Sequence, residues 1–120
     1  MMRVVITGGA GFLGSRLARK ILERGTLAGS DGTQRAITEL VLFDIAPASG
    51  FADPRVKIVT GDVSDPSTIA GVIGNDAQSV FHLAAIVSGQ AEAEFDLGMR
   101  INFDATHHLL EAMRDRKSVV

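Results

Sequence analysis

Three glycines, Gly8, Gly11 and Gly14, lie between an apolar run and an amphipathic pattern. The run, 3–7, is short and rich in β-branched residues, as in a strand buried on both faces. A glycine turn between a strand and a helix points backbone N–H groups and the positive end of the helix dipole at phosphate oxygens. Gly8 would permit the tight turn, Gly11 the approach to a pyrophosphate and Gly14 close helix packing. The sequence therefore predicts a dinucleotide-binding turn, and no Lys-Ser/Thr pair follows it as in a nucleoside-triphosphate loop.

A dinucleotide site also needs an acidic residue near the end of the second strand, where a carboxylate accepts hydrogen bonds from ribose hydroxyls. Asp31 has nearly the usual spacing from Gly14, but it lies in a polar stretch. Asp44 lies further along the chain and ends the apolar run 39–44. Position outweighs spacing, so we assign the role to Asp44, whose charge would repel a 2′-phosphate and favours NAD over NADP. The alternative is that Asp44 only caps the following turn.

Amphipathic patterns predict three helices. The first is 12–24, where Leu13, Leu17 and Ile21 form one stripe that Gly25 ends. The second is 67–73, which an acidic cap and a proline at Asp65-Pro66 begin. The third is 92–116, with a stripe of apolar residues and one threonine at steps of three and four: Phe95, Met99, Phe103, Thr106, Leu109, Leu110 and Met113.

Strands are predicted between these helices, at 3–7, 39–44, 56–60 and 79–84, with the opening of a fifth at 118–120. The polar stretch 26–38 is expected to be an extended surface loop. Alternation of strands and helices is typical of an α/β protein with a doubly wound parallel sheet of Rossmann type. Right-handed crossovers predict a strand order of 3-2-1-4, truncated at the start of strand 5. A ligand would bind at the switch point between strands 1 and 4, beside the glycine turn.

The chain resembles the extended short-chain dehydrogenase/reductase superfamily, and within it the NAD-dependent epimerase/dehydratase family. The matching stretches follow one another in the order expected: TGGAGFLG (7–14), FD (43–44), GDVSD (61–65), FHLAA (81–85) and INFDATHHLLEA (101–112). The resemblance implies an NAD-binding Rossmann domain over 1–120. It also implies an enzyme that works with NAD and a small-molecule substrate, and a possible homodimer that pairs through helices including 92–116.

The resemblance implies roles for further residues. Backbone N–H groups of Phe12 and Leu13 would meet the pyrophosphate, and Asp62 and Val63 would contact adenine. The ribose and nicotinamide side would be lined by Leu83, Ala84 and Ala85, and Asn102 would support the active-site end of the sheet. A substrate pocket would be bordered by Val87, Ser88 and Gly89, for which an ordinary exposed loop is an equal alternative.

Substrate and reaction type follow only from the resemblance. The segment 84–102 is most similar to sugar-acid dehydrogenases, which implies oxidation of a secondary alcohol by hydride transfer to nicotinamide. A nucleotide-sugar epimerase or dehydratase is the alternative within the family, and a non-catalytic NAD-binding or interaction module is the alternative outside it. The family's catalytic Tyr-Lys pair has no counterpart, because the chain contains no tyrosine. We therefore expect these 120 residues to be the N-terminal part of the enzyme, without its catalytic and substrate-binding part, and to be inactive alone.

Composition excludes several other classes of protein. The chain has no cysteine, so it forms no disulfide and has no thiol nucleophile. A net charge of −2 with scattered basic residues argues against nucleic-acid binding. No apolar run is long enough for a membrane span and no secretory leader is visible, so a cytoplasmic location is expected. His82 in a strand is expected to be structural, and the adjacent His107 and His108 point apart, so no metal site is predicted.

Overall fold

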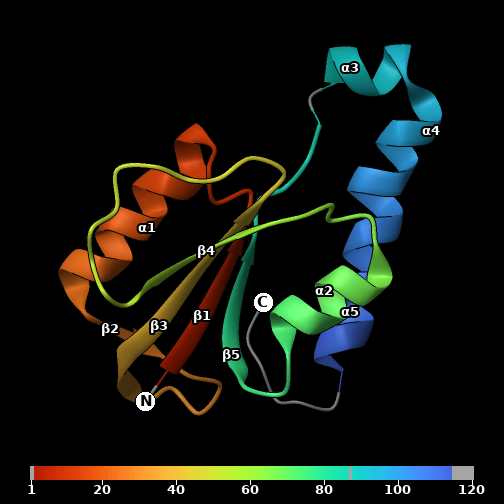
Figure 1. Cartoon of the computed structure of the whole chain (residues 1–120). Helices are drawn as coiled ribbons and strands as arrows, with labels where there is room; N and C mark the ends of the chain where they lie inside the picture. The colour runs from red at the N-terminus through yellow and green to blue at the C-terminus, as the bar shows by residue number, and fades with distance from the viewer. Residues whose placement is uncertain (1, 87, 115–120) are drawn as a thin grey trace.

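A computed structural model of the chain describes residues 2–86 and 88–114. Four parallel strands, β1 (Met2–Thr7), β3 (Gln34–Asp44), β4 (Val56–Thr60) and β5 (Ala77–His82), form a sheet in the order β4-β3-β1-β5 (Figure 1). Counted along the chain without the short β2, this is the predicted order 3-2-1-4. The Rossmann-type fold class is therefore confirmed, while the segment 118–120, predicted to open a fifth strand, lies outside the described residues.

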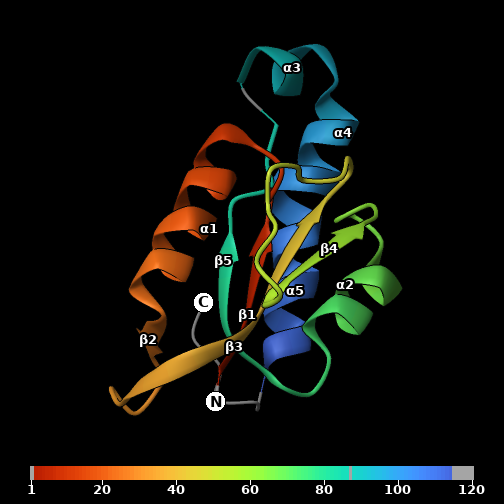
Figure 2. The ribbon, with the colours of Figure 1, turned by 60° about the vertical axis from the view of Figure 1, so that its left-hand side comes forward.

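Helices pack on both faces of the sheet, with α1 (Phe12–Arg24) on one side and α2 (Pro66–Ile73) and α5 (Ala105–Met113) on the other (Figure 2). Successive side chains of a strand point to opposite faces, so β1 contributes to two cores. Val4 and Ile6 pack with Ile21 of α1, whereas Val5 packs in the cluster that contains Leu109 of α5. This double burial explains why the first strand is almost entirely apolar.

The ends of the first two helices form as the sequence predicts. Gly25 follows α1 in the left-handed conformation with φ of 77°, and its N–H donates to the carbonyl of Ile21. Asp65 caps α2 by accepting a hydrogen bond from the backbone N–H of Ser67, with Pro66 as the first helical residue. These local signals are strong because each satisfies backbone groups that a helix end leaves unpaired.

The prediction of a surface loop over 26–38 is wrong. Residues Thr26–Ala28 form β2, which pairs antiparallel with the beginning of β3, and Asp31 lies in the turn between them. Its carboxylate accepts hydrogen bonds from the backbone N–H of Thr33 and from Arg35. Asp31 therefore belongs to a hairpin at the start of β3, whereas Asp44 ends the same 11-residue strand, roughly 30 Å away.

The prediction of one regular helix over 92–116 is also wrong for the described part. The segment consists of α3 (Ser88–Ala93), α4 (Phe95–Gly98), a π-helical stretch η1 (Met99–Asp104) and α5, with a break in helical dihedral angles at Glu94. A π-helix makes i→i+5 hydrogen bonds, so it changes the direction of every side chain that follows. The predicted stripe is split: Leu109 and Met113 are buried, while four members are exposed, namely Phe95, Met99, Phe103 and Leu110.

Close packing at the start of α1 depends on a glycine. A Cβ atom added at Gly14 would collide with the carbonyl oxygen of Gly8 in the turn. The helix therefore approaches the turn more closely than any larger residue permits, and Gly14 itself is buried. By contrast, a Cβ added at Gly71 in α2 would meet no atom within 4 Å.

We predict that Gly14→Ala lowers the free energy of unfolding by about 1–3 kcal/mol, because the methyl group forces α1 away from the turn. Gly71→Ala is the matched control and should raise stability by up to about 1 kcal/mol, since it only replaces a flexible helical residue. Chemical denaturation of both variants measures the effect. Equal changes in the two variants would contradict the packing argument.

Candidate functional site

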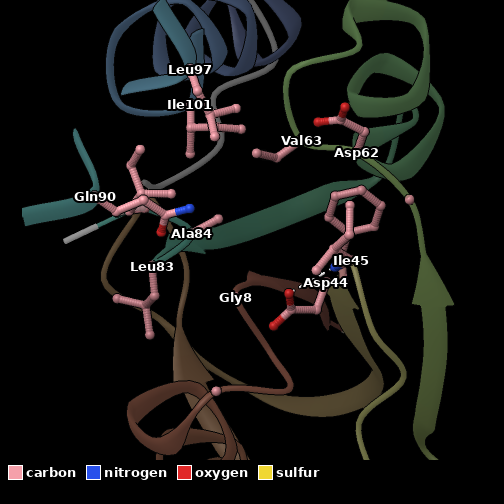
Figure 3. A pocket seen from close by; sticks show the side chains of 15 residues that line it. Gly8, Asp44, Ile45, Asp62, Val63, Leu83, Ala84, Gln90, Leu97 and Ile101 are labelled. Atoms are coloured by element: carbon pink, nitrogen blue, oxygen red, sulfur yellow. Dashed lines mark hydrogen bonds between the residues drawn. The ribbon is translucent and has the colours of Figure 1, made fainter. Parts of the chain in front are cut away.

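A cavity of about 420 Å³ opens at the carboxyl ends of β1, β3 and β5 (Figure 3). It lies where helices on opposite faces of the sheet diverge, the position at which open α/β sheets bind ligands. Eight of the residues predicted from the sequence line it: Gly8, Gly11, Asp44, Asp62, Val63, Leu83, Ala84 and Ala85. Residues from four separate segments of the chain thus meet at the predicted switch point.

The glycine turn forms one wall of the cavity. Gly8 has a φ of 74°, and its carbonyl accepts a hydrogen bond from the N–H of Gly11. Gly11 is the N-cap of α1 and has no side chain that could accept a hydrogen bond. The first backbone N–H groups of the helix therefore have no side-chain acceptor. Phe12 and Leu13 are the first two helical residues, and their side chains point into solvent rather than into the cavity.

Asp44 joins the glycine turn to the end of β3. One carboxylate oxygen accepts a hydrogen bond from the backbone N–H of Ala10 at 3.0 Å, and the other accepts from Ile45 at 2.7 Å. The second contact caps the turn after β3, which is the alternative role that the sequence suggests for Asp44. This cap does not remove Asp44 from the site, because the residue also lines the cavity. Asp31, the rival candidate, does not.

Asp62 presents a second carboxylate from the segment after β4. Its Oδ1 accepts hydrogen bonds from the backbone N–H and the hydroxyl of Ser64, at 2.9 and 2.7 Å. These bonds, and more weakly the charge of Arg100, hold the pKa of Asp62 below its ordinary value. Asp62 is therefore an anion with a fixed orientation, next to the apolar side chain of Val63.

The wall that follows β5 is held by a network of side chains. Thr7 Oγ1 accepts hydrogen bonds from the N–H groups of Leu83 and Ala84. Asn102 does not line the cavity, but its side-chain amide accepts from the N–H of Ile86 and donates to the carbonyl of the same residue. The amide therefore supports the wall from behind.

His82 also belongs to this network, because its ring lies within hydrogen-bond distance of Thr7 Oγ1 at 2.6 Å and Thr106 Oγ1 at 3.0 Å. His107 and His108 contact one another edge to edge, with ring centroids 5.9 Å apart. No group of acidic or histidine residues suited to a metal ion occurs among the described residues, and none of their helices has the length and apolar character of a membrane span.

Seven residues line the cavity that the sequence did not indicate as site residues. The additional lining residues are Phe43, Ile45, Gly61, Ile86, Gln90, Leu97 and Ile101. Leu97 and Ile101 are four residues apart, a helical spacing that could have been found, but the predicted stripe placed a different face of this helix inward. Of the expected substrate pocket, Val87 lies outside the described residues, while Ser88 and Gly89 begin α3.

Comparison with known proteins gives consistent similarities. A sequence profile described as NAD dependent epimerase/dehydratase family matches residues 4–120. A D-erythronate dehydrogenase from Cupriavidus necator is 57% identical over 114 residues, which cover 95% of this chain and 35% of that protein. This chain therefore spans about a third of the length of that relative.

Solved structures give the same picture. A nucleoside-diphosphate-sugar epimerase from Agrobacterium tumefaciens is 34% identical, with a TM-score of 0.82 over 94% of this chain and 32% of that one. A dTDP-glucose 4,6-dehydratase double mutant from Streptomyces venezuelae, solved with NAD bound, is 27% identical, with a TM-score of 0.76 over 98% of this chain and 37% of that one.

Removal of the Ser64 hydroxyl tests the electrostatics of the cavity. We expect Ser64→Ala to raise the pKa of Asp62 toward its ordinary value of 3.8, because the largest cause of the lowering is lost. Ser67→Ala is the matched control, since Ser67 makes the same contact with Asp65 and should shift the pKa of Asp65 instead. Titration of the carboxyl carbons by NMR measures both. An unchanged Asp62 in Ser64→Ala would contradict the assignment.

Proposed function

The chain belongs to the NAD-dependent epimerase/dehydratase family, and on that premise we propose that it binds NAD in the cavity at the carboxyl ends of β1, β3 and β5. The observation that carries the proposal is the meeting of the glycine turn and two oriented carboxylates, Asp44 and Asp62, around one cavity. A dinucleotide needs these groups together, because it offers phosphates to N–H donors and hydroxyl or amino hydrogens to carboxylates.

Each part of the dinucleotide has a proposed partner. The pyrophosphate lies at the N-terminus of α1, against the backbone of Gly11, Phe12 and Leu13, whose exposed side chains do not obstruct it. Asp44 accepts from ribose hydroxyls of the adenosine part, and Asp62 and Val63 contact adenine. The nicotinamide half extends along Leu83, Ala84 and Ala85 toward the apolar residues of η1. This arrangement follows the order of the segments around the cavity.

We further propose that the protein oxidises a secondary alcohol of a small sugar acid, of which D-erythronate is the example that its 57% identical relative supplies. NAD supplies the acceptor for the hydride that leaves the alcohol carbon, while the hydroxyl proton passes to a base. No tyrosine is present to act as that base, so these 120 residues alone are expected to show no turnover. What the described residues do is bind and orient the dinucleotide.

A nucleotide-sugar epimerase is the second candidate, and the 34% identity to a solved enzyme of that name favours it. Both reactions begin with hydride transfer to NAD, so the cavity suits either. Steady-state assays of the full-length protein with D-erythronate and with nucleoside-diphosphate sugars separate them. NADH accumulates with the first substrate if the enzyme is a dehydrogenase, whereas an epimerase regenerates its NAD.

The choice between NAD and NADP provides a test of the site. Calorimetry on the full-length protein should show about tenfold or tighter binding of NAD than of NADP, because Asp44 repels a 2′-phosphate. Asp44→Asn removes the charge but keeps an acceptor oxygen, so it should reduce the ratio between the affinities for NAD and NADP. Asp31→Asn is the control, since it neutralises the rival aspartate in the hairpin turn. A change of preference in the control alone would refute the assignment.

Exposed apolar residues on the α4–α5 segment support a homodimer. Phe95, Met99, Phe103 and Leu110 project from one continuous run of helical residues, and Phe103 is 63% exposed. An apolar stripe of this kind marks a contact surface. Two copies related by a twofold axis would bury the same stripe against itself.

We expect Phe103→Lys to weaken the homodimer by about tenfold or more, because it places a charge in an apolar contact. Asp104→Lys, at the exposed neighbouring position, should leave the dimer intact. Sedimentation of the full-length protein over a range of concentrations measures both variants. A monomeric wild-type protein at every concentration would refute the dimer.

A further inference from the structure

Behind the wall that follows β5, a chain of hydrogen bonds runs through three elements of the fold. The ring of His82 bridges Thr7 on β1 and Thr106 on α5, with its Nδ1 at 2.6 Å from Thr7 Oγ1 and its Nε2 at 3.0 Å from Thr106 Oγ1. Thr7 continues the chain to the backbone of Leu83 and Ala84. The imidazole therefore connects the α5 layer to the residues that line the cavity.

The position of each proton in this chain follows from its partners. The hydroxyl of Thr106 donates to the carbonyl of Asn102 at 3.1 Å, so its oxygen is left to accept from His82. Nε2 of His82 therefore carries the hydrogen, and Nδ1 has a lone pair. At the other end, Thr7 Oγ1 already accepts from two N–H groups, and its own hydrogen is directed to that lone pair. Only the neutral ring with hydrogen on Nε2 satisfies every group.

A second proton on His82 would break this arrangement. Nδ1 would then carry a hydrogen directed at Thr7 Oγ1, so three donors would point at this one oxygen. The hydrogen of the Thr7 hydroxyl would also lose its acceptor, because Nδ1 would no longer have a free lone pair. A hydroxyl oxygen has two lone pairs, so one of the three donors must give up its bond. The N–H of Leu83 has a second acceptor, the backbone carbonyl of Thr7 at 3.1 Å. The donor at risk is therefore the N–H of Ala84, a residue of the cavity wall.

We propose that His82 is a positioning residue for the NAD site, and that its protonation loosens the wall at Ala84 and lowers the affinity for NAD. The NAD part of this inference rests on the proposed function, whereas the effect on the wall does not. His82 does not line the cavity and would act through Thr7.

Among the described residues, no charged group is paired with His82. The other titratable groups on β1, η1 and α5 are Arg3, Arg100, Asp104, His107, His108 and Glu111. None of them makes a hydrogen bond or ion pair with His82 among the described residues: Arg3 pairs with Glu39 at the opposite end of β1, and Glu111 pairs with Arg114. Burial alone lowers the pKa of His82 below its ordinary value of 6.5.

The direction of the pH effect follows from this lowered pKa. The unfolded chain takes up a proton near 6.5, and the folded chain takes it up only at lower pH. The folded state is therefore destabilised as the pH falls below 6.5, until the folded pKa is reached. The carboxylates with lowered pKa, such as Asp62, titrate below 3.8 and do not contribute in this range.

The first experiment measures NAD affinity of the full-length protein by calorimetry from about pH 8 down to about pH 5. We expect the wild-type affinity to fall by up to about tenfold per pH unit once His82 titrates. His82→Asn places a non-titrating acceptor near the Nδ1 position, so it should bind within a few-fold at about pH 8 and lose the acid dependence. His107→Asn, the same substitution at an exposed histidine of α5, should keep it.

The second experiment needs no cofactor and no variant. NMR of the imidazole nitrogens in the wild-type protein should show hydrogen on Nε2. Hydrogen exchange, corrected for its intrinsic pH dependence, should show the N–H of Ala84 losing protection as the ring titrates, while the N–H of Leu83 keeps its bond to the carbonyl of Thr7. Hydrogen on Nδ1 would overturn the inference, and so would amide protection in the wall that does not change through the titration. An NAD affinity that still falls with pH in His82→Asn would overturn it as well. If the protein binds no NAD at any pH but both NMR results are as expected, the proposed function is refuted together with the NAD part of this inference. The positioning of the wall by His82 would then still be supported.

Discussion

The turn after β1 is confined between the ends of two neighbouring strands, and this steric constraint sets the shape of the cavity. A Cβ atom at Gly8 would lie 2.9 Å from the backbone N of Ala84, and one at Gly9 would lie 2.8 Å from Leu42. The turn is also bonded to β3, because the N–H of Gly9 donates to the carbonyl of Phe43. Side chains at these positions would separate strands that must be adjacent, so the space left for a ligand lies beyond the turn, at the N-terminus of α1.

The two sides of this space differ in charge. The start of α1 directs uncapped N–H groups and the positive end of its dipole at the cavity, whereas Asp44 and Asp62 present acceptors from the far side. Asp44 accepts from two backbone N–H groups, and Asp62 accepts from the N–H and the hydroxyl of Ser64, so the direction of each carboxylate is fixed before any ligand arrives. A fixed acceptor loses less entropy on binding than a mobile one. This arrangement favours a ligand that is anionic at its centre and a hydrogen-bond donor at one end.

The sequence predicted those parts of the molecule that depend on local chemistry. The glycine turn and the Asp65 cap of α2 follow from residue types at fixed positions along one chain segment, and the strand order follows from the right-handed crossovers between them. The position of Asp44 at the end of a strand beside the cavity follows in the same way, while its role toward a ribose stays a prediction. The hairpin at 26–36 could not be found this way, because β2 has only three residues, too few for a periodic pattern, and its pairing depends on tertiary geometry. The segments after β5 were misjudged for a related reason: a stripe at steps of three and four cannot distinguish a regular helix from one with a π-helical insertion.

That insertion has a structural consequence for the α4–α5 segment. Leu97 and Ile101 face the cavity, while Phe95, Met99 and Phe103 are exposed, and the two sets alternate at intervals of two residues. Residues two apart on an α-helix or a π-helix lie on roughly opposite sides, so both sides of this segment are apolar. A helix with two apolar sides needs two partners, because one buried face leaves the other in water. The cavity and the sheet provide one, and in the proposed homodimer the same apolar side of a second copy provides the other.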